Sequence, residues 1–314
     1  MSRTIRLIIL LVFLVGALSG AGAQAQLSIA SLPGTVSVAN QIFSESTTAI
    51  PITVAHEGDA ASWFVTVSRG NSSSFDPRQL QRRFLFFFTL SLNYNIFTPS
   101  DSIARDTTGP LSASNVLSGS FAASTSVQTD SREFTVRIPS EQFVRQGTYT
   151  DEVDISLYRG SVNNVDAAVR VERRTVDISS VTSSVAEVGL VESGGAASNV
   201  DRNFTMDFGP LSSGETKTAD LLFRANSGYF LEAESANQGE LLNVNRPGNF
   251  TIPYEFRYDG DTYDLSSPRT LDVSFLSGTG ISFARRPISV QIGAFSNVPS
   301  GLYEDVITFT ISTF

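Results

Sequence analysis

The chain has 314 residues, enough for two domains of ordinary size. It contains no cysteine and one histidine, His56, so disulfides, thiolate metal sites and sites built from several histidines are excluded. The formal net charge of −9 argues against nucleic acid as a partner, because nucleic-acid-binding proteins present a basic face.

The N-terminal residues predict export. Arg3 and Arg6 precede an apolar run over residues 7–18, and small residues follow at Ala23 and Ala25. This order is typical of a secretory signal peptide, and the run is shorter than the roughly 20 residues that a membrane-spanning helix needs. We therefore expect residues 1–25 to be a signal peptide, cleaved after Ala23 or Ala25, and no membrane insertion of the mature chain. The alternative is a retained membrane anchor.

The first half of the chain is a series of short alternating segments, which are typical of β-strands. The phenylalanine-rich residues 84–90 predict a strand buried on both faces, the alternative being an exposed adhesive surface. Residues 98–133 are rich in Ser, Thr, Asp and Gly and are expected to be mainly loops, where ligand contacts would lie. His56, next to Glu57 and Asp59, is expected on a surface loop rather than as a catalytic base. The predicted strands cover residues 27–32, 35–38, 50–55, 62–67, 84–90, 117–122, 134–138 and 149–157.

One motif occurs twice, 154 positions apart, as Gly-x-Tyr-x-Asp followed by an alternating strand. The match extends upstream, where residues 134–138 correspond to residues 288–292. Two duplicated domains explain a period of this length better than a solenoid does. We expect the motif to be structural, with its tyrosine forming a tyrosine corner. Its members are Gly147, Tyr149 and Asp151 in the first copy and Gly301, Tyr303 and Asp305 in the second.

The two copies differ in the residues that come after the motif and its strand. Residues 165–171 alternate again and predict a closing strand, paired as a hairpin with residues 149–157. No such strand is expected beside residues 303–311. In that case Ile307, Phe309 and Ile311 would line an open apolar cleft, and the alternative is that they are ordinary core residues of a complete sandwich. The predicted strands of the second half cover residues 204–208, 218–225, 229–233, 252–258, 271–275 and 288–292, with short strands within residues 176–191.

These patterns predict an all-β protein with two tandem immunoglobulin-like β-sandwiches, the C-terminal one lacking its last strand. We expect the first sandwich to span residues 26–173 and the second to span residues 174–314.

Several segments of the second half resemble the spore coat protein U domain, which occurs in subunits of archaic chaperone–usher pili. The resemblance covers most of residues 204–314 and, more weakly, residues 84–157. The chain lacks the cysteines that are usual in this family. The segments, in order, are Phe208-Gly-Pro-Leu, Asn226-Ser-Gly-Tyr-Phe-Leu, Ser235-Ala-Asn-Gln-Gly-Glu-Leu, Ile252-Pro-Tyr and Gly301-Leu-Tyr-Glu-Asp-Val.

The resemblance implies a mode of assembly by strand donation. A periplasmic chaperone lends the missing strand, an outer-membrane usher exports the subunit, and a neighbouring pilin subunit supplies the final strand. It also implies that the C-terminal carboxylate of Phe314, at the end of the cleft, is bound by the chaperone. One closed and one open domain resemble a two-domain tip adhesin on a cell-surface fibre, with the first domain contacting an unknown surface or host ligand.

Two other classes of function remain open. A free-standing secreted binding module, for example for carbohydrate, would be a monomer that folds alone. An enzyme is not expected, because no nucleophile–base or metal constellation can be assembled, although a pair of carboxylates would suffice for a glycosidase. We expect no cofactor. Asp259, Asp261 and Asp264 offer carboxylates for calcium, but Asp-Gly between strands first indicates a hairpin turn.

Overall fold

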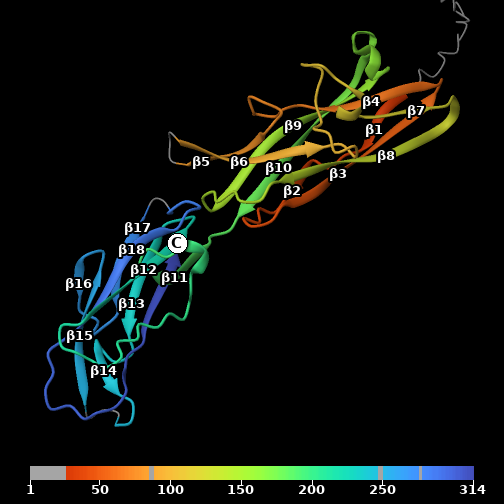
Figure 1. Ribbon diagram of the computed structural model, residues 1–314. Helices are drawn as coiled ribbons and strands as arrows, with labels where there is room; N and C mark the ends of the chain where they lie inside the picture. Colours follow the sequence, from red (N-terminus) through yellow and green to blue (C-terminus); the bar gives the residue numbers. More distant parts are fainter. Residues whose placement is uncertain (1–25, 85–87, 247–249, 276–277) are drawn as a thin grey trace, which may run out of the picture.

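The structure, a computed structural model, describes residues 26–84, 88–246, 250–275 and 278–314. It is built almost wholly of β-strands, arranged as two sandwiches that follow one another along a rod (Figure 1). The all-β prediction is confirmed. The expected signal peptide, residues 1–25, lies outside the described residues. Among those described, no helix is long and apolar enough to cross a membrane.

The strands of the first sandwich form one continuous hydrogen-bonded sheet that folds around a hydrophobic core. β6 pairs with β5 along most of its length and with β8 through residues 95–97, so the ladder passes from one face of the sandwich to the other. Alternate side chains of each strand point inward, and their burial stabilises the fold by about 1.5–3 kcal/mol for each large aliphatic residue. The strands are β1 (Gln26–Ser31), β2 (Thr35–Ser37), β3 (Ser46–Gly58), β4 (Ala61–Val67), β5 (Arg78–Phe84), β6 (Phe88–Phe97), β7 (Leu117–Phe121), β8 (Ser124–Ile138), β9 (Gly147–Arg159) and β10 (Val169–Thr182).

The first sandwich contains its own closing strand, as the alternation predicted. β10 runs antiparallel to β9 from Val169, opposite Arg159, to Thr182, opposite Gly147. On its second edge β10 pairs in parallel with β2. The strand begins later than expected, because residues 162–167 form a short 3₁₀ helix, η2 (Val162–Ala167).

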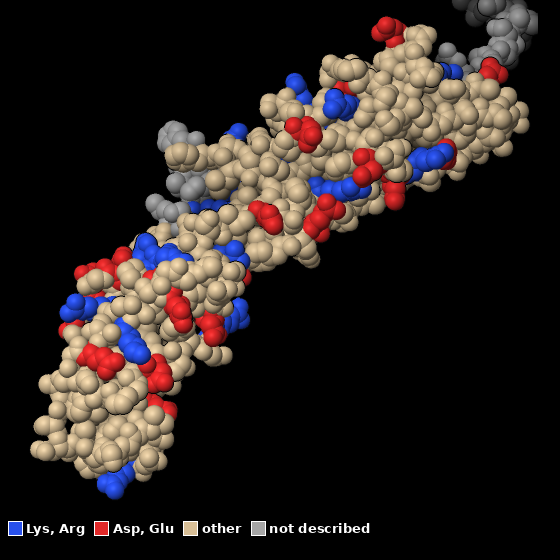
Figure 2. Space-filling view, viewed as in Figure 1, with Lys and Arg blue, Asp and Glu red and all other residues tan. Residues whose placement is uncertain are grey.

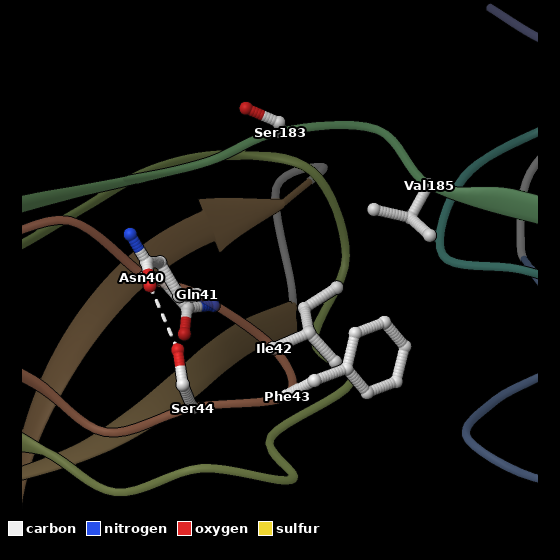
Figure 3. Close-up of a pocket in the computed structure, with 7 residues that line it drawn as sticks. All are labelled: Asn40, Gln41, Ile42, Phe43, Ser44, Ser183 and Val185. Carbon is white, nitrogen blue, oxygen red and sulfur yellow. Dashed lines mark hydrogen bonds between the residues drawn. The ribbon is translucent and has the colours of Figure 1, made fainter.

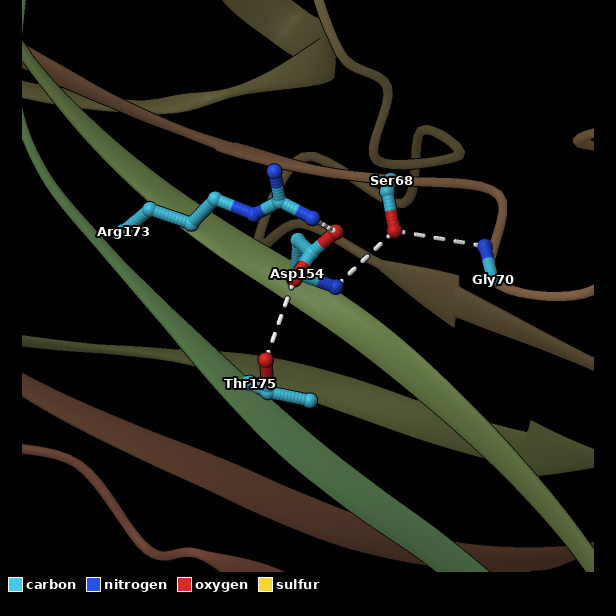
Figure 4. A network of polar contacts seen from close by, with 5 residues as sticks. All are labelled: Ser68, Gly70, Asp154, Arg173 and Thr175. Carbon is cyan, nitrogen blue, oxygen red and sulfur yellow. Dashed lines mark hydrogen bonds and ion pairs between the residues drawn. The ribbon is translucent and has the colours of Figure 1, made fainter.

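Polar side chains on the outer face also fix β10 to β9 (Figure 4). Asp154 on β9 pairs with Arg173 of β10 and accepts a hydrogen bond of 3.1 Å from the Thr175 hydroxyl. The backbone N–H of Asp154 donates to Ser68, which follows β4. The closing strand is thus tied to its neighbour by side chains as well as by the ladder.

The boundary expected at residue 173 falls inside β10. Val176 and Ile178 are fully buried in the first core, so this part of the chain belongs to the first sandwich. The second sandwich begins after Ser183, with β11. The charged residues 172–174, between the first part of β10 and Val176, hid the length of the strand in the sequence.

The second sandwich has its own core, and its strands are mostly shorter than those of the first. One sheet has the order β11-β12-β18-β15-β14-β19, with β16 on β15, and the other has the order β17-β13-β20. Its strands are β11 (Ala186–Glu192), β12 (Thr216–Ala225), β13 (Tyr229–Ser235), β14 (Glu240–Asn243), β15 (Thr251–Tyr258), β16 (Asp261–Tyr263), β17 (Arg269–Ser274), β18 (Ala284–Ile292), β19 (Tyr303–Glu304) and β20 (Ile307–Thr313). The remaining 3₁₀ turns of the described chain are η1 (Ala113–Asn115) and η3 (Ala197–Asn199).

The two sandwiches repeat the same strand pairing. Val65 lies opposite Leu157 in the β4–β9 ladder, and Leu231 lies opposite Ile311 in the β13–β20 ladder. Leu157 and Ile311 are 154 positions apart, which is the period of the repeated motif. β9 and β20 are therefore equivalent strands, as are β4 and β13.

The repeated motif makes the same hydrogen bonds in both copies. The Tyr149 hydroxyl donates to the Arg145 carbonyl at 2.7 Å, and the Tyr303 hydroxyl donates to the Pro299 carbonyl at 2.9 Å. Both bonds reach four residues back and close a tyrosine corner. The glycine of each motif has a positive φ, which favours a residue without a side chain.

A second shared bond involves the aspartate of the motif. Tyr94 donates to Asp151 at 2.7 Å in the first sandwich, and Tyr254 donates to Asp305 at 2.5 Å in the second. Each carboxylate also accepts the backbone N–H of an asparagine, Asn71 or Asn237. The start of the last shared strand is thus fixed by one hydrogen-bond pattern in both sandwiches.

Two predictions in the first sandwich are wrong. Residues 84–90 are not one buried strand: Phe84 ends β5, Phe88 begins β6 and pairs with Phe84, and residues 85–87 lie outside the described residues. Phe88 is 63% exposed. His56 is not on a surface loop but buried in β3, because that strand continues to Gly58; its ring stacks on Phe121 at 5.4 Å.

We predict that Tyr94→Phe lowers the free energy of unfolding of the first sandwich by about 1–3 kcal/mol, because the buried Asp151 carboxylate loses a donor. Trp63 is the only tryptophan and lies in the first core, so its fluorescence during urea unfolding reports this sandwich. Tyr254→Phe removes the equivalent bond of the second sandwich and serves as the matched control. Equal shifts of the Trp63 transition by both variants would contradict the prediction.

Candidate binding groove

The second sandwich is open along one side. A cavity of about 890 Å³ lies between its two sheets and reaches the surface. Its lining is mainly apolar and comes from both sheets and from the chain that follows η3. The residues that line it include Leu190, Phe204, Met206, Phe208, Leu241, Ile252, Tyr254, Phe256, Ile288, Val290, Tyr303, Asp305, Ile307 and Phe309.

One wall of the groove is β20. Ile307 and Phe309 line the cavity and are half-buried, whereas Thr308 and Thr310, which alternate with them, are exposed on the opposite face. β20 pairs with β13 on one edge, and no strand of the described chain pairs with its other edge. The backbone N–H and C=O groups along this edge are therefore free to bind an added strand.

The opposite wall is an extended segment, residues 203–208. Its apolar side chains, Phe204, Met206 and Phe208, alternate with exposed polar ones and pack against the core. The sequence predicted a strand here, and that prediction is wrong: the described chain gives this segment no backbone–backbone hydrogen bond. The alternation is that of a strand, and what is missing is the neighbour that would pair with it.

The first sandwich shows what such a neighbour looks like. There β2 follows β1, as residues 203–208 follow β11, and it buries Val36 beside the core. β10 lies between β2 and β9 and pairs with both. The groove of the second sandwich is the equivalent place without that strand.

The floor of the groove is apolar except at one end. The ring of Phe256 lies 6.0 Å from that of Phe309. At the polar end, Asp305 accepts hydrogen bonds from the hydroxyls of Tyr254 and Ser235, each at 2.5 Å, and from the backbone N–H of Asn237. Burial, followed by the bond to Asp305, raises the pKa of Tyr254 well above its usual value. This carboxylate is engaged in structure, and the groove as a whole suits an extended apolar chain.

The residues predicted to line a cleft are placed differently from one another. Ile307 and Phe309 face the groove, and Ile311 packs against the same core where β11 lies beside β20. Phe314 does not line the groove. Its ring lies against Phe230, at 4.9 Å, and Phe275, at 5.8 Å, on the outer face of the sheet.

The carboxylates of Asp259, Asp261 and Asp264, considered above as calcium ligands, do not form one cluster. Asp264 accepts from the backbone N–H of Ser266 and pairs with Arg269, and Asp259 pairs with Arg286. Among the described residues, no group of three or more His, Asp or Glu side chains is placed to hold a metal ion. The Asp-Gly pair forms the hairpin turn between β15 and β16.

No family model matches the chain, and no curated protein matches it. Solved structures align with it over most of its length. One of them is a chain from the structure of the complex of the chaperone CsuC with the tip adhesion subunit CsuE, from archaic chaperone–usher Csu pili of Acinetobacter baumannii. It shows 13% identity and a TM-score of 0.45, and the alignment covers 91% of this chain and 99% of that chain.

Two further structures are also adhesive subunits. The CupB6 tip adhesin of Pseudomonas aeruginosa shows 9% identity and a TM-score of 0.36, covering 91% of this chain and 93% of that one. CfaE, the adhesive subunit of the CFA/I fimbria of enterotoxigenic Escherichia coli, shows 11% identity and a TM-score of 0.29, covering 89% and 92%.

We predict that the second sandwich loses stability as the pH rises above about 10, the usual pKa of tyrosine. Folded Tyr254 keeps its proton where the unfolded residue loses it, because its folded-state pKa is raised. The unfolded state then binds fewer protons, so the free energy of unfolding falls with rising pH. Urea unfolding of the full chain, followed by circular dichroism between about pH 8 and 12, should show a shallower fall for Tyr254→Phe. A fall equally steep in that variant would contradict the assignment.

Proposed function

We propose that this chain is an exported adhesive subunit of a chaperone–usher fibre, held in the fibre by a strand that another subunit inserts into the groove. The observation that carries the proposal is the difference between two equivalent strands. β9 has β10 on its edge, and β20 has no neighbour there among the described residues. The sequence resemblance of residues 204–314 to spore coat protein U domains supports the same assignment.

The first sandwich suggests how the inserted strand lies. It runs antiparallel to β20 and parallel to residues 203–208, as β10 runs antiparallel to β9 and parallel to β2. Ile307 and Asp305 are equivalent to Val153 and Asp151, which lie opposite Val176 and Ile178. The inserted strand therefore places apolar side chains two residues apart over this part of the groove.

Strand insertion answers a physical need of the groove. An open edge beside apolar surface invites pairing with any other exposed strand, which leads to aggregation. An inserted strand would form hydrogen bonds with the backbone of both walls. Burial of each of its inward apolar side chains would stabilise the complex by about 1.5–3 kcal/mol. A chaperone in the periplasm and a neighbouring pilin subunit in the fibre are the partners that would supply such a strand, and an usher would export the subunit.

We place the subunit at the tip of the fibre, with the first sandwich facing the surface or host ligand. β1 begins at Gln26, directly after the expected cleavage sites, and pairs with β3. Residues 26–31 are therefore engaged in the first sandwich rather than free to act as a donor strand. Phe314, whose carboxylate the resemblance assigns to the chaperone, follows β20 and lies beside Gln146 of the first sandwich.

The first test uses the β10 sequence, Val169–Thr182, as a synthetic peptide added to the full chain. We expect it to raise the melting temperature of the second sandwich by about 5–10 °C at roughly 100 times its Kd, because it binds only the folded groove. The matched control peptide carries Val176→Asp and Ile178→Asp. On the acceptor side, Phe309→Asp should abolish the effect.

A melting temperature indifferent to the peptide, or an equal shift by the control peptide, would count against strand insertion. The second sandwich would then be complete as it stands. A free-standing secreted binding module, for example for carbohydrate, would become the better proposal.

The export part of the proposal has its own test. Intact-mass measurement of the chain secreted to the periplasm should give a mature protein that starts at Gln24 or Gln26. A mature protein that keeps residues 1–23 would contradict cleavage and favour a retained anchor.

A further inference from the structure

The joint between the two sandwiches is made by specific polar contacts. Asn226, in the turn between β12 and β13, is buried and donates from its side chain to the carbonyls of Val144, at 3.2 Å, and Ser183, at 2.8 Å. Its own carbonyl accepts the backbone N–H of Gln146 at 3.3 Å. The loop before β9 in the first sandwich thus binds one turn of the second.

Aromatic side chains surround a second contact at the joint. The Arg224 guanidinium lies 5.0 Å from the ring of Phe43, 5.7 Å from Phe143 and 4.6 Å from Phe283, and it pairs with Glu187. Figure 3 shows the small pocket beside this contact, where Phe43 and Ile42 face the linker residue Val185. The linker from Thr182, the end of β10, to Ala186, the start of β11, is three residues long.

The two sandwiches point the same way along the rod. β9 starts at the joint, at Gly147, and runs away from it, whereas β20 runs toward the joint and ends beside it. The C-terminus lies beside the first sandwich in Figure 1, and the Gln146 side chain donates to the Phe314 carbonyl at 3.0 Å. The start of β9 therefore lies at the joint, and the start of β20 lies at the opposite end of the second sandwich. These two ends are equivalent, one in each sandwich.

We call this opposite end of the second sandwich the far pole and define it by residues 293–302 and Val244. Val298 and Ser300 are the equivalents of Val144 and Gln146, and the two tyrosine corners hold their loops in the same way. Within the described chain, the Val298 carbonyl and the Ser300 N–H have no hydrogen-bond partner. Leu302 and Val244 are 57% and 45% exposed beside them. Figure 2 shows few charged side chains at this end of the rod.

We propose that the far pole docks the body of the next subunit as the first sandwich docks the second. This inference rests on the proposed function, because the inserted strand would bring that body to the pole. The partner is a β-sandwich whose turn presents an asparagine like Asn226, with its side chain donating to the Val298 carbonyl and its carbonyl accepting from the Ser300 N–H. The connection between inserted strand and body is as short as the linker that follows β10.

The far pole copies only part of the joint. Phe143, which contacts Arg224, has Asn297 as its equivalent, so the aromatic contact around an arginine is not repeated. Docking at the pole relies on backbone groups and on the exposed apolar pair. It therefore accepts different subunits that share the turn rather than one matched partner.

Two extended forms of the full chain test the inference. Phe314 is equivalent to Gly160, so a copy of the chain from residue 161 can follow it directly. The first extension adds residues 161–182, which are the connector and closing strand. The second adds residues 161–314, which include a further sandwich. We expect both to melt at a higher temperature than the parent chain, and X-ray scattering to show the longer one as a straight rod of three bodies.

Two substitutions in the longer form probe the pole. Ser300→Pro removes the N–H and Ser300→Ala keeps it, so only the proline variant should loosen the third body. Asn226→Ala in the added copy alone should do the same, with the original Asn226 intact. The loss of one hydrogen bond across the pole in either variant should speed proteolysis of the copied linker roughly fivefold.

The outcomes separate the two proposals. If the short extension fails to raise the melting temperature, strand insertion fails and the docking proposal fails with it. If the short extension stabilises the chain but the third body is loosely tethered, and neither Ser300→Pro nor the copied Asn226→Ala changes linker proteolysis, then docking at the far pole is overturned while strand insertion stands. Stabilisation together with a rod that these two variants loosen supports both.

Discussion

A strand edge that borders an open apolar groove is exposed to pairing with any other strand, and this constraint separates the two sandwiches. β9 meets it within its own sandwich, because β10 follows and pairs along its full length. β20, the equivalent strand, has one edge paired and the other facing an apolar groove. The proposed inserted strand would give β20 the partner that β10 gives β9.

The tyrosine corner and the tyrosine–aspartate bond hold one end of the groove in a fixed geometry. Tyr303 and Asp305 fix the start of the last strand before anything binds, with the same contacts that Tyr149 and Asp151 make in the closed sandwich. An inserted strand then meets a wall already in its final geometry, which reduces the ordering cost of binding. The structure offers the motif no free group for chemistry, since the Asp305 carboxylate is engaged by hydroxyl and N–H donors.

The sequence predicted the parts that rest on period and duplication, and missed those that rest on a neighbour. The alternation around Ile307 and the spacing of the two motifs were enough to predict the unequal sandwiches. The separation of β5 from β6 was missed because the phenylalanine run contains no Gly, Pro, Asn or Asp to mark an end of a strand. The length of β10 was missed because charged residues interrupt its alternation. Phe204 and Met206 alternate as a strand does, but pairing depends on a strand that the rest of the described chain does not supply.

The direction of β20 has a mechanical consequence. β20 and β9 lie along the rod, and so would any strand placed beside β20. A pull along the rod then loads every hydrogen bond of that ladder at once, in shear, rather than opening the bonds one after another from an end. A strand inserted beside β20 would therefore resist a pull along the rod. Such a non-covalent attachment could carry tension.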